Sequence, residues 1–232
     1  MIPTLSIPLL SGALAVDNRS SVRLLVSQPV CGGLLAGLVL GSARDGFMAG
    51  ALLQMLFLGT VPVRGIAPPD LPLAGVGGSA LYILAQRSMS VDSSARGLVL
   101  VLALAAAVGI AAVGRIVHRF WESRSYFLTA LALRLAERGH FRLAAALHFS
   151  SVPVHFGIGF ALTAGVLLGG VPAMVMIVEG ISGRWGDPLG AFPALLPFIG
   201  AGSLLALNLT RVRIVLYLAG FCSVFIFMLF RG

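Results

Sequence analysis

The sequence predicts an all-α polytopic membrane protein: a helical bundle with broken or re-entrant helices and a cytoplasmic-side amphipathic arm. Three observations predict this class. Hydrophobic residues make up 58% of the 232 positions, charged residues only 10%, and the mean hydropathy is +1.01. Soluble domains carry about 25% charged residues, so much of this surface must face lipid. The apolar residues form long runs and do not alternate, which excludes the pattern of an outer-membrane barrel.

The charge distribution also indicates a membrane protein. The chain has sixteen basic residues, all of them arginine, against eight acids, for a net charge of +8. In a soluble protein this excess would suggest a nucleic-acid partner, but most of these arginines stand at the ends of apolar runs, where they bias loops to the cytoplasm. Cys31 and Cys222 lie inside apolar runs, which is typical of small buried side chains and not of a disulfide or metal pair.

The first apolar segment, residues 1–16, is short of the roughly 20 residues that a full crossing needs. It lacks the basic start of a cleaved signal peptide, so we expect a short first membrane segment. A polar connection over 17–23 leads to a helix over 24–41. Glycines recur in this helix at four-residue spacing, which lets another helix backbone approach closely. They are Gly33, Gly37 and Gly41.

The stretch from 27 to 70 is apolar, yet glycine and proline break it. It also carries four polar residues that a plain spanning helix does not need: Gln28, Gln54, Arg64 and Asp70. In lipid, backbone that leaves the helix must be buried in protein or line a cavity, and polar side chains at depth usually mark a pathway. The stretch therefore predicts a transport or binding site inside the bundle.

Two interruptions divide this region. Residues 44–46 (Arg-Asp-Gly) end the first apolar run, and four prolines between 59 and 73 exclude a regular helix there. The apolar segment that follows, 75–85, is again short for a crossing. Short hydrophobic pieces around such a break are typical of discontinuous transporter helices. We expect the broken-helix region, 24–85, to contain the site.

Residues 98–114 form the clearest spanning helix, after a polar loop over 86–96. From 115 to 142 there are six arginines and two glutamates, which is the strongest indication of a cytoplasmic side in the chain. Apolar residues still recur there every three to four positions. We therefore expect an amphipathic helix over 115–147 that lies along the interface or forms an arm in contact with a partner.

Residues 156–230 are predicted to form the C-terminal helices. A polar loop over 179–188 interrupts them, and Trp185 in this loop suits the membrane interface. The whole chain, 1–232, then forms a single membrane domain of about six to eight hydrophobic segments, not all of them full crossings.

No sequence motif of soluble catalysis is present: we find no P-loop, nucleophile elbow, H-E-x-x-H or C-x-x-C. The four histidines are scattered, which favours interfacial or loop roles over metal ligation or proton relay. They are His118, His140, His148 and His155. We expect no catalytic residue, no metal site and no cofactor.

The segment from Gln28 to Asp70 carries an ordered set of motifs. They are Gln28-Pro29-Val30, a Gly37-to-Gly41 run, Gly46, Gly50, Leu53-Gln54, Leu58-Gly59, Val61-Pro62-Val63 and Pro68-Pro69-Asp70. In order and spacing this segment resembles the N-terminal signature of the IIC membrane subunit of the mannose/fructose/sorbose family of the phosphoenolpyruvate-dependent phosphotransferase system. A weaker similarity continues through Leu196-Pro197-Phe198 and the last two apolar runs.

Three positions depart from the family pattern. Ser42 stands where an acid is usual, and Arg64 stands where a small residue is common. Gln54 stands where an acid is usual, although glutamine also occurs in the family.

The resemblance implies a sugar permease subunit, multi-pass in the bacterial inner (plasma) membrane, and not an enzyme in its own right. The implied partners are a IID-type membrane subunit, a cytoplasmic IIA/IIB phosphocarrier pair, further copies of the chain in a homo-oligomer, the lipid bilayer and a hexose-type sugar, with no nucleic acid. The phosphoryl group travels on the soluble proteins, so this chain needs a polar pocket for sugar hydroxyls and no nucleophile. Transport would be a rigid-body movement of the broken-helix unit against a scaffold.

Four residues are the predicted sugar ligands, and each has a plainer alternative. Asp70 is an acceptor for sugar hydroxyls, or the N-cap of a helix that starts near Leu71. Gln54 is an amide that both donates to and accepts from sugar hydroxyls, or it forms an interhelical hydrogen bond that only holds helices together. Gln28 is a second such amide, or a polar residue at a helix start. Arg64 is a partner of Asp70 or a gate charge, or a snorkelling cation.

Two other functions remain open at this stage. Ser42, Gln54 and Arg64 would also suit a degenerate, non-transporting interaction subunit that keeps the scaffold but has lost the site. An unrelated transporter or intramembrane enzyme, in which Pro68-Pro69-Asp70 is a coincidence, is the third hypothesis.

Overall fold

The computed structural model describes residues 2–19, 26–58, 69–89 and 93–190, and the side chains of these residues except at 2–4, 93–95 and 182–190. The secondary-structure elements in these ranges are all helical. They are α1 (Ile2–Arg19), α2 (Pro29–Val39), α3 (Ala43–Phe57), α4 (Leu71–Leu73), η1 (Ala74–Gly78), α5 (Ser79–Ser88), α6 (Ser93–Glu137), α7 (Phe141–Phe149), α8 (Ser151–Gly165), η2 (Val166–Gly170) and α9 (Val171–Gly190). Within them two helical stretches, 96–137 and 141–181, are long and apolar enough to cross a membrane. The predicted all-α membrane class is confirmed.

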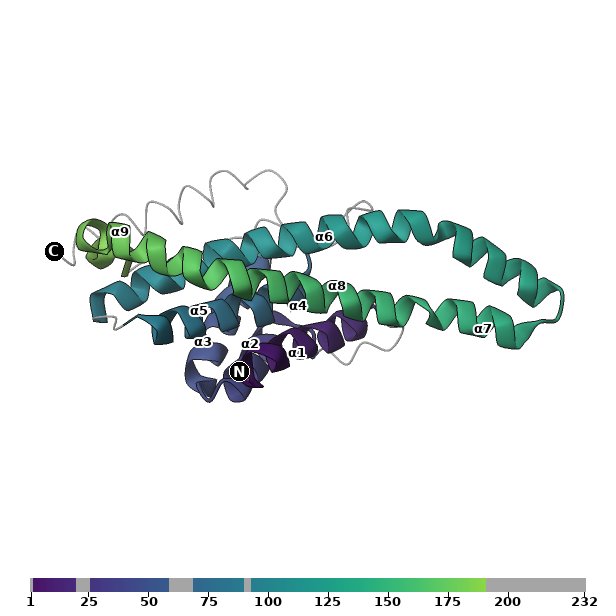
Figure 1. Ribbon diagram of the computed structural model, residues 1–232, viewed down its shortest axis with the longest axis horizontal. Helices are drawn as coiled ribbons and strands as arrows, with labels where there is room; N and C mark the ends of the chain where they lie inside the picture. The colour runs from purple at the N-terminus through teal and green to yellow at the C-terminus, as the bar shows by residue number, and fades with distance from the viewer. Residues whose placement is uncertain (1, 20–25, 59–68, 90–92, 191–232) are drawn as a thin grey trace, which may run out of the picture.

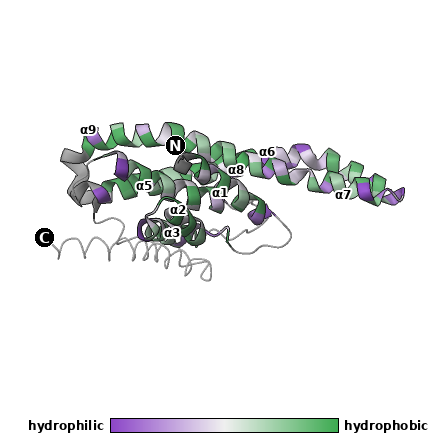
Figure 2. Cartoon of the chain, turned by 60° about the horizontal axis from the view of Figure 1, so that its bottom comes forward, coloured by the Kyte–Doolittle hydropathy of each residue, from purple (hydrophilic) through white to green (hydrophobic). Residues whose placement is uncertain are grey.

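The molecule is elongated, and its long axis follows two antiparallel helical rods (Figure 1). One rod is α6, and the other runs through α7, α8, η2 and α9. Helices α1 to α5 pack beside one half of these rods, while α7 and the end of α6 extend beyond them as a hairpin. We call this hairpin, residues 119–150, the arm. Figure 2 shows apolar residues along the bundle and polar residues concentrated at the tip of the arm.

Helices α2 and α3 form a tight hairpin, because glycines face each other across it. A Cβ atom on Gly33 would lie 2.5 Å from the carbonyl oxygen of Gly46 and 2.7 Å from Cα of Gly50. The turn between them passes through Gly41, whose φ of +69° is a left-handed conformation that glycine adopts without strain. The close helix approach expected from the glycine spacing is therefore present.

The broken segment α4–η1–α5 lies at the centre of the bundle. Every residue from 72 to 83 is buried, and η1 is a π-helical turn inserted between two α-helical pieces. Its small residues admit neighbouring backbones: a Cβ on Gly75 would lie 2.7 Å from Cα of Pro29, and one on Gly78 would lie 2.5 Å from Cβ of Ala107. The segment thereby packs against both α2 and α6.

The predicted element boundaries need several corrections. Helix α1 continues through 17–19, which was expected to be a polar connection, and the helix expected over 24–41 begins only at Pro29. The interruption expected at 44–46 lies at 40–42, because the chain turns at Gly41 and Ala43 already begins α3.

The polar segments around the two long rods are also helical where loops were expected. α5 reaches Ser88 and α6 starts at Ser93, inside the loop expected over 86–96. The loop predicted over 179–188 is wrong, since α9 continues to Gly190. The last two apolar runs of the predicted C-terminal helices, which cover 192–209 and 214–230, lie outside the described residues.

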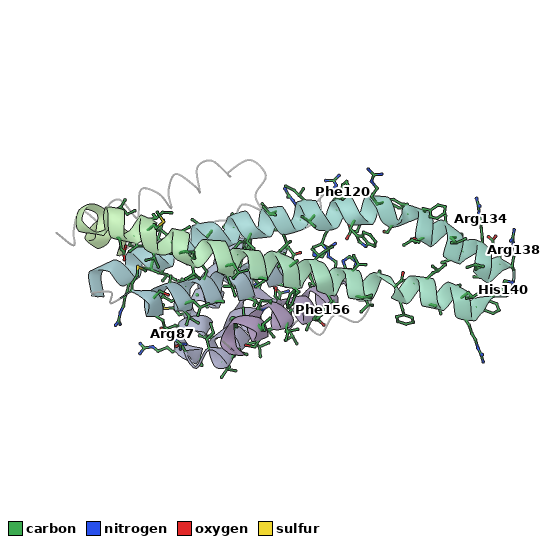
Figure 3. The ribbon with its side chains drawn as sticks, viewed as in Figure 1. Arg87, Phe120, Arg134, Arg138, His140 and Phe156 are labelled. Atoms are coloured by element: carbon green, nitrogen blue, oxygen red, sulfur yellow. The ribbon has the colours of Figure 1, made fainter. Side chains whose placement is uncertain are left out.

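The predicted amphipathic helix does not begin a separate element at 115. Helix α6 continues without interruption from Ser93 to Glu137, and at about 1.5 Å per residue it is roughly 67 Å long. The choice between an interfacial helix and an arm in contact with a partner stays a prediction. Figure 3 shows Arg134, Arg138 and His140 at its far tip, away from the bundle.

Candidate functional site

Asp70 occupies the start of the broken segment, directly before α4. Its Oδ1 accepts a hydrogen bond from the backbone N–H of Leu73 at 3.4 Å, which is the geometry of an N-cap. Its own backbone N–H donates to the carbonyl of Ala111 on α6 at 3.1 Å. The side chain is only 1% exposed. Asp70 is thus the predicted N-cap, and it is also a carboxylate enclosed by protein.

Gly114 lets α6 pass against this carboxylate. A Cβ at position 114 would lie 2.9 Å from Cβ of Asp70 and 3.3 Å from its Cγ, and closer still to Cδ1 of Leu73. Any side chain there would push α4 away from α6. The approach of these two elements therefore depends on a glycine at this position.

Two basic groups lie at the other carboxylate oxygen. Nε2 of His118, on α6, is 3.1 Å from Oδ2 of Asp70, and an arginine nitrogen of Arg19, at the end of α1, is 4.0 Å from it. His118 is completely buried, and Arg19 is 21% exposed. Burying a carboxylate is costly unless charges and donors surround it. Here α1 and α6 each supply one.

The contact network continues outward from His118. Its Nδ1 lies 3.0 Å from Nδ1 of His155 on α8, with ring centroids 5.1 Å apart. Arg19 also forms an ion pair with Glu122, one turn beyond His118 on α6. We call these five side chains the Asp70 cluster; it joins α1, the N-cap of α4, α6 and α8. Chemically it combines two carboxylate acceptors, two imidazoles that can each donate or accept a hydrogen bond, and a fixed cation.

Gln28 and Gln54 lie at the same end of the α2–α3 hairpin. Gln28 is the N-cap residue of α2, and Gln54 lies one turn after Gly50 on α3. Pro29 approaches both Gly50 and Gly75 closely, so the backbones that carry both amides converge on the start of the broken segment. Oε1 of Gln54 is buried without a hydrogen-bond partner.

The structure therefore brings together only part of the predicted site. Among the described residues, no hydrogen bond joins either glutamine to Asp70, and Arg64 lies outside the described residues. The cluster uses Arg19, His118, Glu122 and His155 in their place, and the sequence analysis assigned none of them to the site. Nor does any group of three or more His, Cys, Asp or Glu side chains in the described ranges have a geometry suited to a metal ion.

One sequence signal could have identified His118. The buried face of α6 runs through Ala107, Ala111, Gly114 and His118, at spacings of four, three and four residues. A histidine that continues a stripe of small residues is expected on the packed face of its helix. The sequence analysis instead favoured an interfacial position for His118, because arginines flank it in the sequence. His155, on a helix of nearly uniform hydropathy, carries no comparable signal.

Comparison with known proteins assigns the chain to a family. One family profile, described as the sorbose-specific IIC component of the PTS, the phosphotransferase system, matches residues 2–230. The chain belongs to this family. The resemblance seen in the Gln28–Asp70 motifs is thus confirmed over nearly the whole sequence of this IIC protein.

Two curated relatives are similar over parts of the IIC chain. The sorbose-specific EIIC component of Klebsiella pneumoniae is 27% identical over 137 residues, which is 59% of this chain and 47% of the relative. A putative N-acetylgalactosamine permease IIC component 2 of Escherichia coli K12 is 36% identical over 56 residues, which is 24% of this chain and 42% of the relative. The matches thus span about half the length of these relatives.

Proposed function

We propose that this IIC chain is the sugar-binding permease subunit of a phosphotransferase system, with Asp70 as the principal acceptor for hydroxyls of a hexose-type sugar. The observation that carries the proposal is the buried carboxylate of Asp70 at a helix break in the centre of the bundle. Ionisable residues within membrane bundles are rare and usually mark a substrate pathway. A carboxylate accepts from two neighbouring hydroxyls at once, which suits a sugar ring.

Gln54 and Gln28 are proposed as the amides that complete the pocket. The buried and unpartnered Oε1 of Gln54 supports this assignment, because such an atom gains a hydrogen bond when a hydroxyl arrives. Arg64 remains proposed as a gate charge. The partnership with Asp70 first expected of it is taken by Arg19 among the described residues.

The rest of the proposal follows from family membership. The chain works in the bacterial inner membrane with a IID-type membrane subunit, in an assembly of several copies, and passes the sugar inward to a IIA/IIB phosphocarrier pair. The arm carries most of the arginines between 115 and 142 and is proposed to lie on the cytoplasmic side. The chain supplies binding and passage, and the phosphocarriers supply the chemistry.

The test is equilibrium binding of four sugars to the purified full chain: sorbose, fructose, mannose and N-acetylgalactosamine. We expect at least one of them to bind, and Asp70→Asn to weaken that sugar tenfold or more, because a hydrogen bond to a charged group contributes about 1.5–3 kcal/mol. Glu179→Gln is the matched control, since Glu179 is exposed on α9, and should bind as the unaltered chain does. Failure of all four sugars to bind would favour the non-transporting interaction subunit.

A further inference from the structure

The Asp70 carboxylate is enclosed by neighbouring groups, although Oδ2 and Nε2 of His118 are in contact without an aligned hydrogen bond. Oδ1 is engaged by the Leu73 N–H at 3.4 Å, and Oδ2 lies 3.1 Å from His118 and 4.0 Å from Arg19. With 1% of the side chain exposed, a sugar can reach it only by taking over one of these contacts. The Leu73 contact belongs to the backbone of α4, so the exchangeable partners are the two basic side chains.

The two histidines restrict one another's protons. With Asp70 ionised, the tautomer of His118 that suits the carboxylate is the one with its proton on Nε2, the atom that faces Oδ2. Its Nδ1 is then an acceptor, and the Nδ1 of His155, 3.0 Å away, must be the donor. His155 is thereby held in the Nδ1–H form, with its Nε2 left free to take a further proton.

We propose that His118 is the internal partner which a sugar hydroxyl replaces on Asp70, that His155 fixes the proton on the correct nitrogen of His118, and that protonation of this pair opposes sugar binding. His118 and His155 are thus positioning residues for the sugar site. The inference rests on the proposed role of Asp70 and adds proton linkage to it.

The charges that face the pair are balanced by one added proton. Facing it are Arg19 from α1, Asp70 at the start of α4, and Glu122 on α6 itself. With neutral imidazoles, this set has one positive and two negative charges, so a single added proton makes it neutral. A second proton would place N–H groups on both facing Nδ1 atoms and break their hydrogen bond. When Nε2 of His155 takes up the added proton, the proton between the two Nδ1 atoms can pass to His118, which then faces Asp70 as a cation.

Imidazole is the side chain whose charge changes between about pH 5 and 8. A charged partner makes roughly twice as strong a hydrogen bond to a carboxylate as a neutral one. We therefore expect the affinity for the sugar that binds to fall about tenfold between pH 8 and pH 5.5. A tenfold change in affinity is what the strengthening of one such hydrogen bond produces.

The first experiment needs no sugar. Nitrogen-15 NMR of the full chain, labelled at histidine and reconstituted in lipid, reports which ring nitrogen carries the proton. Substituting His140 and His148 by Gln, both exposed on the arm, leaves only the pair visible. At pH 8 we expect protonated Nε2 on His118 and protonated Nδ1 on His155. The same protonated nitrogen on both rings would overturn the inference.

The second experiment compares pH profiles of sugar affinity. His118→Gln places an amide N–H near the position of Nε2 but cannot titrate, so it should bind as at pH 8 and lose the pH dependence. His148→Gln, on the exposed arm, is the matched control and should keep the normal profile. If His118→Gln does not fold, His155→Asn serves in its place, since it keeps a donor near Nδ1 and also cannot titrate.

The outcomes separate the inference from the function on which it rests. A sugar that binds equally well at both pH values, or a His118→Gln chain that keeps the slope, would refute the proton linkage while leaving Asp70 as a ligand. Absence of binding by all four sugars would refute the proposed function, and the NMR spectra would still decide the arrangement of the histidine pair.

Discussion

Gly114 offers a direct test of how closely α6 approaches the Asp70 cluster. Replacing it by Ala adds a Cβ 2.9 Å from Cβ of Asp70 and closer still to the side chain of Leu73. Overpacking of this kind costs about 1–3 kcal/mol, while Ala in place of Gly in a helix contributes about 1 kcal/mol of stability. The net change in the free energy of unfolding is therefore a loss of about 0–2 kcal/mol.

The same helix provides a matched control. Gly109 lies on α6 five positions earlier, is exposed, and a Cβ there would meet nothing within 4 Å. Gly109→Ala should keep the full helix gain, so the two variants should differ by about 1–3 kcal/mol. For a chain of this size each kcal/mol corresponds to about 2–4 °C in Tm.

The assay is thermal unfolding of both variants in the same detergent, followed by loss of helical circular dichroism. We expect Gly114→Ala to melt at least about 2 °C below Gly109→Ala, and to bind sugar more weakly because Asp70 has been displaced. Equal melting temperatures together with normal sugar binding would show that α6 and α4 do not touch as described, and the geometry of the cluster would be refuted.

Two further predictions concern packing elsewhere in the bundle. Gly33→Ala should lower Tm clearly, because its Cβ would lie 2.5 Å from the backbone of α3. Gly157→Ala is the control and should leave Tm unchanged, because a Cβ there would meet nothing within 4 Å. Equal Tm values for the two variants would argue against the tight hairpin. Thr163→Val should cost about 0.6–2 kcal/mol in chemical unfolding, since Oγ1 of Thr163 donates to Oγ of Ser11 at 2.6 Å in a fully buried pair. The added change Ser11→Ala should then cost less than it does alone, and strictly additive effects in this double-mutant cycle would contradict the pairing.

The position of Asp70 shows how far local sequence reasoning reaches. A proline pair before an aspartate predicts extended backbone and then a helix start, and both the N-cap contact and the start of α4 at Leu71 are present. Glycine spacing likewise predicted a close helix pair, because the absence of a side chain is a property of the residue itself. Helix ends were predicted less well, since polar residues at 179–188 were taken for a loop although α9 continues through them.

The sequence by itself determined the class of the protein and the broken segment, and its motifs indicated the family. The class and the broken segment follow from composition, helical period and local backbone chemistry, which act over a few residues, whereas the family rests on the resemblance of the motifs. Only the tertiary structure decided which side chains surround Asp70. His118 and His155 are 37 positions apart and Arg19 and Glu122 are 103 apart, and a helical period gives the buried face of each helix but not the partner it meets. The cluster exists because the glycine at 114 lets α4 and α6 close on one another, bringing charges together that no local pattern connects.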